Sequence, residues 1–310
     1  MIHERLAFAK LKIMRRFLPL LLFFLLTGFA FGQPVSAADL TPAQAQALEQ
    51  RALTTELRTV RETSHPMRYQ LRKSSPRLTS TKEIVETRDG DVARLVALND
   101  RPLSPADEQR EEARLDALAS DPSRQRHRTP SEEADTGIVL KLLRMLPQAF
   151  LYEYAGPGTS STGGTGSSRG TGSSGKVERF TFRPNPRFSP PDLETQALTA
   201  MSGEIWIDAA QERVTRLEGH LQRDTDYGWG ILGKLDKGGW IVIEQADVGH
   251  RQWRIVRFQM KMNLRVLFKT RNFDTIEEMT RYEPVAAGLG YRQAIQLLRA
   301  DAGSSAPGGH

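Results

Sequence analysis

The feature that most constrains the fold is the stretch Ser202–Val285, a series of short runs in which apolar and polar residues alternate. Its first run is GEIWID at residues 203–208, and glycine, asparagine and aspartate separate many of the runs that follow. Alternation with a period of two is typical of strands with one buried face, and these turn residues favour antiparallel hairpins. The stretch therefore predicts consecutive strands of an antiparallel sheet.

The upstream half adds helices and further strands. Residues 40–62, 104–119 and 132–145 have helical patterns, and residues 66–98, 148–154 and 176–182 alternate as strands do. About ten strands joined mostly by short turns must curl, because strands twist and wide flat sheets are uncommon. We predict an α+β fold: a strongly curved antiparallel sheet, an unclosed β-barrel of about ten strands, with helices covering its concave face.

The first 37 residues predict an export signal. A basic start precedes an apolar run over residues 17–31, and Val35-Ser36-Ala37 supplies the small residues of a cleavage site. An apolar run of roughly 15 residues is short for a membrane-spanning helix, which needs about 20. The alternative is an uncleaved N-terminal anchor. The expected location is the periplasm, and a peripheral position at the outer membrane is a second possibility.

Charge and cysteine content narrow the function. The chain has a formal charge of +6, but residues 1–37 carry five basic residues against one acidic, which leaves about +2 on the remainder. So small an excess is weak evidence for nucleic acid, and we predict no nucleic-acid partner. The chain has no cysteine, so it has no disulfide, no thiol chemistry and no lipid-modified cysteine.

We predict one domain over residues 38–285. Residues 156–175 are almost entirely glycine, serine and threonine, a composition that predicts a flexible segment. It can be a linker between domains or an enlarged loop between neighbouring strands, and strand patterns on both sides favour the loop. Residues 286–310 are predicted to be a tail with a short helix followed by disorder.

The apolar side of the predicted sheet is the candidate ligand surface. The alternative is that each of these residues is buried in a solid hydrophobic core and contacts no ligand. The residues predicted to line it are Ile205, Ile207, Leu217, Ile241, Ile243, Val256, Phe258, Met260 and Met262. The helix predicted to cover it presents Ile138, Leu142 and Met145, which recur at helical spacing.

Basic residues recur with one parity in the segment after residue 256. Arg257, Lys261, Arg265 and Lys269 share one parity and are predicted to form a basic strand face. This face is either the solvated side of the sheet or a docking face for an envelope protein or an anionic membrane surface.

The run at 203–208, its turn and RVTRLE at residues 213–218 resemble the hairpin of the LolA/LolB-like outer-membrane lipoprotein carrier superfamily. The exported chain that starts with a helix and continues as a wide meander is also similar to that family. The resemblance implies an unclosed β-barrel with helices as a lid over an apolar cavity that holds acyl chains. It implies no particular contact residue, and the Gly/Ser stretch, the charged helix at 104–119 and the proline-rich residues 184–191 have no counterpart in the family pattern.

No catalytic motif stands in the sequence. There is no Gly-x-Ser-x-Gly elbow and no phosphate-binding loop, and His220, Asp224, Asp226 and His250 match no metal-ligand spacing. We therefore predict a protein without enzymatic activity, metal or cofactor. The expected function is an exported carrier that binds a lipid or lipoprotein acyl chain in an apolar cavity. The alternative is a non-enzymatic envelope interaction protein with a filled core and a basic docking face.

Overall fold

The computed structural model describes residues 39–59, 64–121, 140–158, 176–227, 233–266 and 269–304. The chain separates into two compact units, Met1–Asp39 and Leu40–His310. The predicted export signal, Ile138 and residues 159–175 of the Gly/Ser stretch lie outside the described residues. All the helices and strands described below belong to the second unit.

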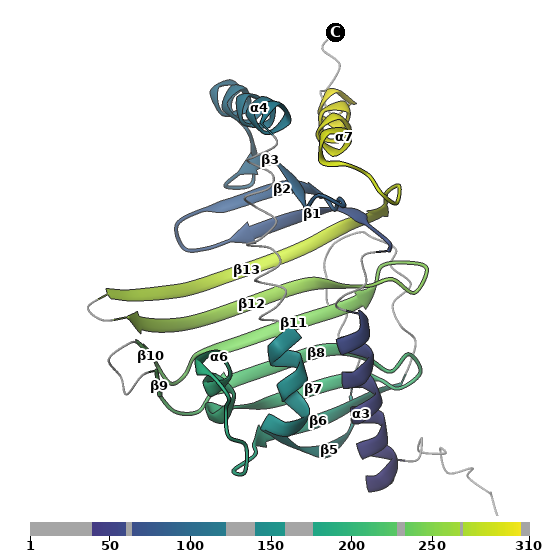
Figure 1. Ribbon diagram of the computed structural model, residues 1–310, viewed down its shortest axis with the longest axis vertical. Coiled ribbons are helices and arrows are strands. Elements are labelled where there is room, and N and C mark those ends of the chain that lie inside the picture. The colour runs from purple at the N-terminus through teal and green to yellow at the C-terminus, as the bar shows by residue number, and fades with distance from the viewer. Residues whose placement is uncertain are drawn as a thin grey trace, which may run out of the picture. The chain divides into compact units, whose positions relative to one another are not determined.

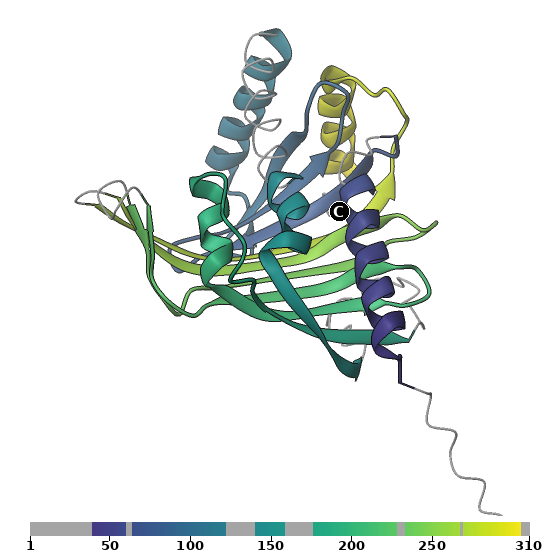
Figure 2. The same cartoon turned by 60° about the horizontal axis from the view of Figure 1, so that its bottom comes forward.

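One antiparallel sheet of thirteen strands dominates this unit (Figure 1), and its path runs β4-β3-β2-β1-β13-β12-β11-β8-β7-β6-β5. The end strands β4 and β5 do not pair with each other, so the sheet is open, and it curves visibly (Figure 2). The α+β prediction of a curved, unclosed antiparallel sheet is confirmed. Its strands are β1 (Met67–Ser74), β2 (Thr79–Val85), β3 (Val92–Leu98), β4 (Arg101–Pro102), β5 (Phe150–Gly158), β6 (Val177–Pro184), β7 (Met201–Asp208), β8 (Arg213–Leu221), β9 (Thr225–Tyr227), β10 (Gly233–Leu235), β11 (Trp240–Asp247), β12 (Trp253–Val266) and β13 (Lys269–Pro284).

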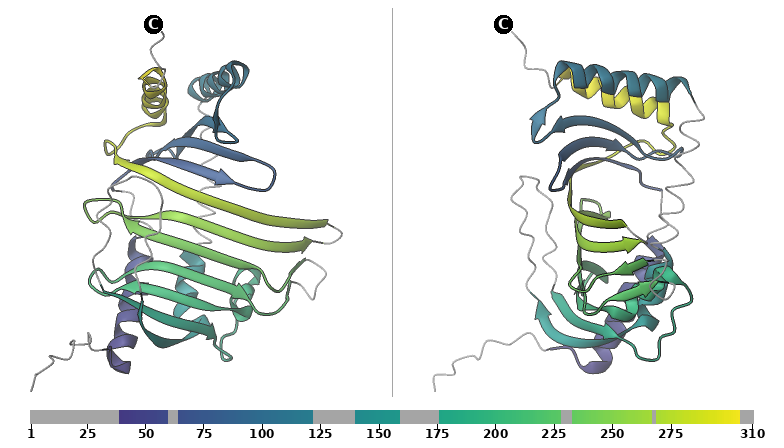
Figure 3. Two further views of the ribbon diagram at one scale, coloured as in Figure 1. Left: turned by 180° about the vertical axis from the view of Figure 1, so that it is seen from behind. Right: turned by 90° about the vertical axis from the view of Figure 1, so that its left-hand side faces the viewer.

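Helices accompany both ends of the sheet (Figure 3). Figure 1 shows one group in front of β5–β8 and a pair beside β1–β3. The described helices are α3 (Pro42–Thr59), residues 140–149, the short α6 (Leu193–Gln196) with the 3-10 turn η1 (Ala197–Ala200), α4 (Pro105–Ser120) and α7 (Tyr291–Ser304).

Strand register separates the two faces of the sheet. Ile205 lies opposite Leu217, Leu217 opposite Ile243, and Ile243 opposite Phe258. Directly opposed residues of antiparallel strands point to the same side. We call the face that bears Ile205 and Phe258 the inner face and the other the outer face.

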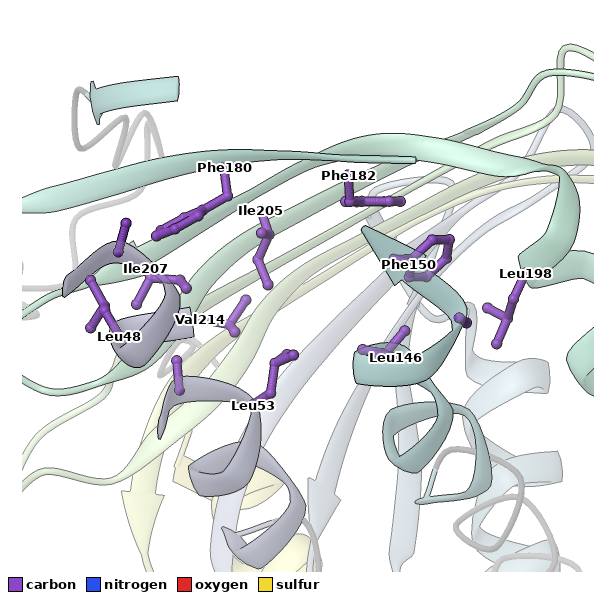
Figure 4. Packing of buried hydrophobic residues seen from close by; sticks show 13 residues of the cluster. Leu48, Leu53, Leu146, Phe150, Phe180, Phe182, Leu198, Ile205, Ile207 and Val214 are labelled. Atoms are coloured by element: carbon purple, nitrogen blue, oxygen red, sulfur yellow. The ribbon is translucent and has the colours of Figure 1, made fainter. Parts of the chain in front are cut away.

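The larger core lies on the inner face of β5–β8. α3 and the helix at 140–149 pack there, and Figure 4 shows their leucines directed toward the aromatic and branched side chains of the strands. The buried side chains labelled in Figure 4 are Leu48, Leu53, Leu146, Phe150, Phe180, Phe182, Leu198, Ile205, Ile207 and Val214.

A buried ion pair fastens α3 to β8. Arg213 Nε and Nη2 donate to the two carboxylate oxygens of Glu56 at 2.8 and 3.0 Å, and the backbone N–H of Val214 donates to Glu56 at 3.0 Å. Both side chains are 9% exposed, and the Arg213 guanidinium lies 5.2 Å from the centre of the Trp253 ring. These bonds satisfy charges that would be costly to bury alone.

The smaller core lies on the outer face. Ser80 lies opposite Lys73, Lys73 opposite Glu277, and Glu277 opposite Phe258, so Ser80 points inward. Val85 is five residues further along β2 and points outward. It packs with Val92 of β3 against Leu115 and Leu118 of α4 and Ala294, Ile295 and Leu298 of α7. Helices therefore cover opposite faces at the two ends of the sheet.

Two expectations about this end need correction. The prediction placed the helices on one face of the sheet, but α4 and α7 pack on the other face, where Leu115 of α4 is fully buried. The helix in the predicted tail 286–310 is α7, whose Ala294, Ile295 and Leu298 are at most 1% exposed. The apolar side chains of α4 and α7 pack against each other, so residues 291–298 belong to the folded unit.

Gly203, near the start of the β7–β8 hairpin, has a clear packing role. A Cβ atom on Gly203 would lie 1.8 Å from the carbonyl oxygen of Glu218 on the neighbouring strand. Only glycine permits this close approach of β7 and β8.

Candidate ligand-binding surface on the inner face

The inner face of the middle strands carries the strongest candidate site. Ile241 lies opposite Met260, Ile243 opposite Phe258, and Met262 opposite Phe273, which brings side chains of β11, β12 and β13 together. All of these side chains are partly or substantially exposed, and Phe273 is 38% exposed. The register therefore assembles a partly open apolar surface from residues as far as 32 positions apart in the sequence.

The predicted lining residues divide into two groups. Ile205 and Ile207 are 1% and 0% exposed and belong to the core under α3, and Leu217 packs against that core. Ile241, Ile243, Phe258, Met260 and Met262 remain partly exposed on the inner face. Val256 is also partly exposed, but it lies at a bulge and has no direct partner on β11. The open part of the predicted surface is thus centred on β11 and β12.

The predicted covering helix lies at one side of this surface. Leu142 and Met145 are partly buried and pack against the core of β5–β8. The helix at 140–149 is therefore attached to the same core as α3.

Sequence reasoning missed Phe273 and Glu49. Phe273 lies on β13, which continues to Pro284 and pairs with both β12 and β1. An ion pair of 2.6 Å between Lys73 and Glu277 joins β1 to β13 in the second half of this strand. The alternation of Phe273, Thr275 and Glu277 was the available signal, but its apolar content is too low to predict a strand.

Glu49 of α3 is an ionisable group in the larger core. It is 6% exposed, and burial raises its pKa from 4.5 to about 7. Tyr152 of β5 lies nearby, and burial followed by the charge of Glu49 raises its pKa above the ordinary value. The underside of α3 consequently changes charge near neutral pH.

The predicted basic docking residues occupy two faces. Arg257 lies opposite Glu244 and Glu278 on the outer face, Lys261 lies 3.8 Å from Asp274, and Arg265 Nε donates to Asp236 at 3.0 Å. Lys269 lies opposite Val266, which turns it to the inner face. The four residues therefore do not share one face, because β12 ends at Val266 and Lys269 begins the antiparallel strand β13.

Two of the His and Asp residues considered as metal ligands interact with other charged side chains. Asp224 pairs with Lys234 at 2.7 Å, and a nitrogen of His220 lies 3.0 Å from Glu218. Within the described ranges no group of three or more His, Asp or Glu residues is arranged to hold a metal ion. No described helix has the length and apolar character needed to cross a membrane.

Comparisons with known proteins define the fold class no further. No protein-family model matches the chain, and no curated protein or solved structure matches it either. The protein therefore belongs to the α+β fold class and is built on an open, curved antiparallel sheet of thirteen strands.

Proposed function

We propose that the protein is an exported, non-enzymatic carrier that binds the acyl chain of a lipid or lipoprotein on its inner face. The single observation that carries the proposal is the apolar surface on β11, β12 and β13. Its side chains, Ile241, Ile243, Phe258, Met260, Met262 and Phe273, are incompletely buried although they continue from the core. Contiguous apolar surface that stays open to solvent is typical of binding sites.

The composition of this surface suits a long flexible ligand. Two methionines lie beside aromatic and branched side chains, and methionine adapts its shape to irregular apolar partners. Because the sheet does not close into a barrel, a long ligand can extend beyond the surface. A periplasmic location and an outer-membrane lipoprotein partner are part of the proposal, and they rest on the predicted export signal and the hairpin resemblance.

Ligand uptake tests the proposal directly. We would purify the full chain from its host membranes under mild conditions, examine it by native mass spectrometry for bound lipid, and titrate the delipidated protein with a fluorescent fatty acid. We expect a bound lipid or saturable uptake of the probe. Absence of both would contradict the proposal.

Neighbouring residues of β12 provide a matched pair of variants. Met262 points inward and Asn263 outward, so Met262→Asp places a charge on the apolar surface whereas Asn263→Asp does not. We expect Met262→Asp to weaken fatty-acid binding at least tenfold and Asn263→Asp to leave it unchanged. Equal effects of the two would show that the inner face is not the site.

The alternative is a docking protein that uses the cations on β12. If the chain binds no lipid and Arg257→Glu abolishes capture of an envelope partner, this alternative is supported. The acidic neighbours of Lys261 and Arg265 weigh against it, because paired cations offer little excess charge to a partner.

A further inference from the structure

A second candidate site lies on the outer face, behind the larger core. A hollow of about 920 Å³ is formed there by β6, β7 and β8, with residues 157 and 158 at its side. Arg179, Trp206 and Arg216 lie opposite one another across the three strands, and so do Thr181, Glu204 and Glu218. The volume is within the range of ligand-binding clefts, roughly 300 to 1,000 Å³.

Trp206 forms a wall of this hollow in a fixed position. The Arg216 guanidinium lies 5.4 Å from the centre of its ring, and a Cβ atom on Gly158 would lie 3.0 Å from its Cδ1. The indole is partly exposed. An indole held in this way offers an apolar surface and one N–H donor within a polar site.

The charges of the hollow are balanced and mutually engaged. Two arginines, Arg179 and Arg216, face two glutamates, Glu204 and Glu218. Arg216 donates to Glu218 at 2.8 Å and also bonds to Glu244, while Arg179 donates to the carbonyl oxygen of Ala155 at 3.3 Å. The bond from Arg216, ahead of that from His220, lowers the pKa of Glu218, so this carboxylate stays charged. Balanced charge favours an uncharged ligand over an anion or a cation.

Hydrogen-bonding capacity remains at the edge of the hollow. The Glu204 carboxylate lies 3.9 Å from Arg179 but, like the Ser202 hydroxyl, forms no hydrogen bond within the described part of the chain. His220 and Gln222 also line the hollow. This mixture of acceptors and donors matches hydroxyl groups, which both donate and accept. We propose that the hollow binds a neutral saccharide, with one sugar face on Trp206 and hydroxyls bonded to Glu204 and Ser202.

Calorimetric titration tests this site independently of lipid binding. The probes are the uncharged oligosaccharides cellotetraose and N-acetylchitotetraose, with inorganic phosphate as the anionic comparison. We expect saturable binding of at least one oligosaccharide and none of phosphate. Glu204→Gln should weaken that binding about tenfold, because it removes a charged acceptor while preserving shape. Trp206→Ala should abolish it.

Two controls separate a lost site from a lost fold. Circular dichroism should give the same spectrum for Glu204→Gln and the unaltered protein, and Met262→Asp on the inner face should bind the oligosaccharide normally. Failure of both oligosaccharides to bind would overturn the saccharide proposal, and so would binding of phosphate. Oligosaccharide affinity in Glu204→Gln and Trp206→Ala equal to that of the unaltered protein would also overturn it. None of these results affects the acyl-chain proposal, whose surface lies on the other face of the sheet.

Discussion

The two ends of the sheet are stabilised in different ways. At the β5–β8 end, α3 carries the buried Glu56, which pairs with Arg213, and also Glu49, which has no described partner. At the β2–β3 end, α4 and α7 meet through aliphatic side chains, and their ion pairs, such as Arg299 with Glu112, are partly exposed. The comparison indicates that the attachment of α3 depends on a specific buried pair and on pH, whereas the contact between α4 and α7 depends mainly on apolar burial.

The largest effect is expected where the ion pair at the first end is broken. Arg213→Ala leaves Glu56 buried without its cation, which should destabilise the protein by about 3–5 kcal/mol. Chemical denaturation monitored by tryptophan fluorescence measures this change. A loss below about 1 kcal/mol would show that α3 is not fastened by this pair.

The second effect concerns α7. Ile295 is 1% exposed between α4 and the sheet, so Ile295→Ala should cost about 2–5 kcal/mol. The adjacent Gln296 is exposed, and Gln296→Ala should change the free energy of unfolding by less than about 0.5 kcal/mol. Equal, small effects would mean that α7 is a loosely attached tail after all.

The third effect is a pH dependence at the first end. The pKa of Glu49 is about 7 in the folded protein, above its ordinary 4.5, so the folded state binds the extra proton between these values. Its contribution to stability therefore falls as pH rises from about 4.5 through 7, by at most about 3 kcal/mol. Glu49→Gln should remove this dependence and raise stability at pH 8. Unchanged pH profiles in the variant would contradict the assignment.

The smallest effect is expected at the exposed pairs of the second end. Arg299 lies 2.8 Å from Glu112 and 2.6 Å from Asp116, with each side chain about a third or more exposed. Arg299→Ala should cost less than about 1 kcal/mol, and salt should diminish even this difference. A loss as large as that of Arg213→Ala would erase the distinction between the two ends.

Much of the fold could be predicted from the sequence because strand alternation is a local signal. Residues 203–208 and 213–218 alternate clearly, and they form β7 and β8 as expected. The pairing of α4 with α7 could not be predicted in this way. Leu115 and Ile295 are 180 positions apart, and no local pattern specifies that these two helices pack against each other.

The candidate site was predictable in composition but not in extent. Met260 and Met262 alternate with polar residues and lie on the inner face as a strand requires. Which apolar residues stay open depends on where helices attach, and that is a property of tertiary packing. Lys269 likewise lies on the face opposite Arg257, because it belongs to β13 and not to β12, a change of strand that counting parity along the sequence does not detect.

The most direct test of the acyl-chain proposal is to map where a ligand lies. A photoreactive fatty acid would be bound to the full chain, activated by light, and located by peptide mass spectrometry. We expect labelling at inner-face residues of β11, β12 and β13, above all Phe258, Met260, Met262 and Phe273. Labelling confined to outer-face residues, or labelling that excess unlabelled fatty acid does not displace, would contradict the proposal.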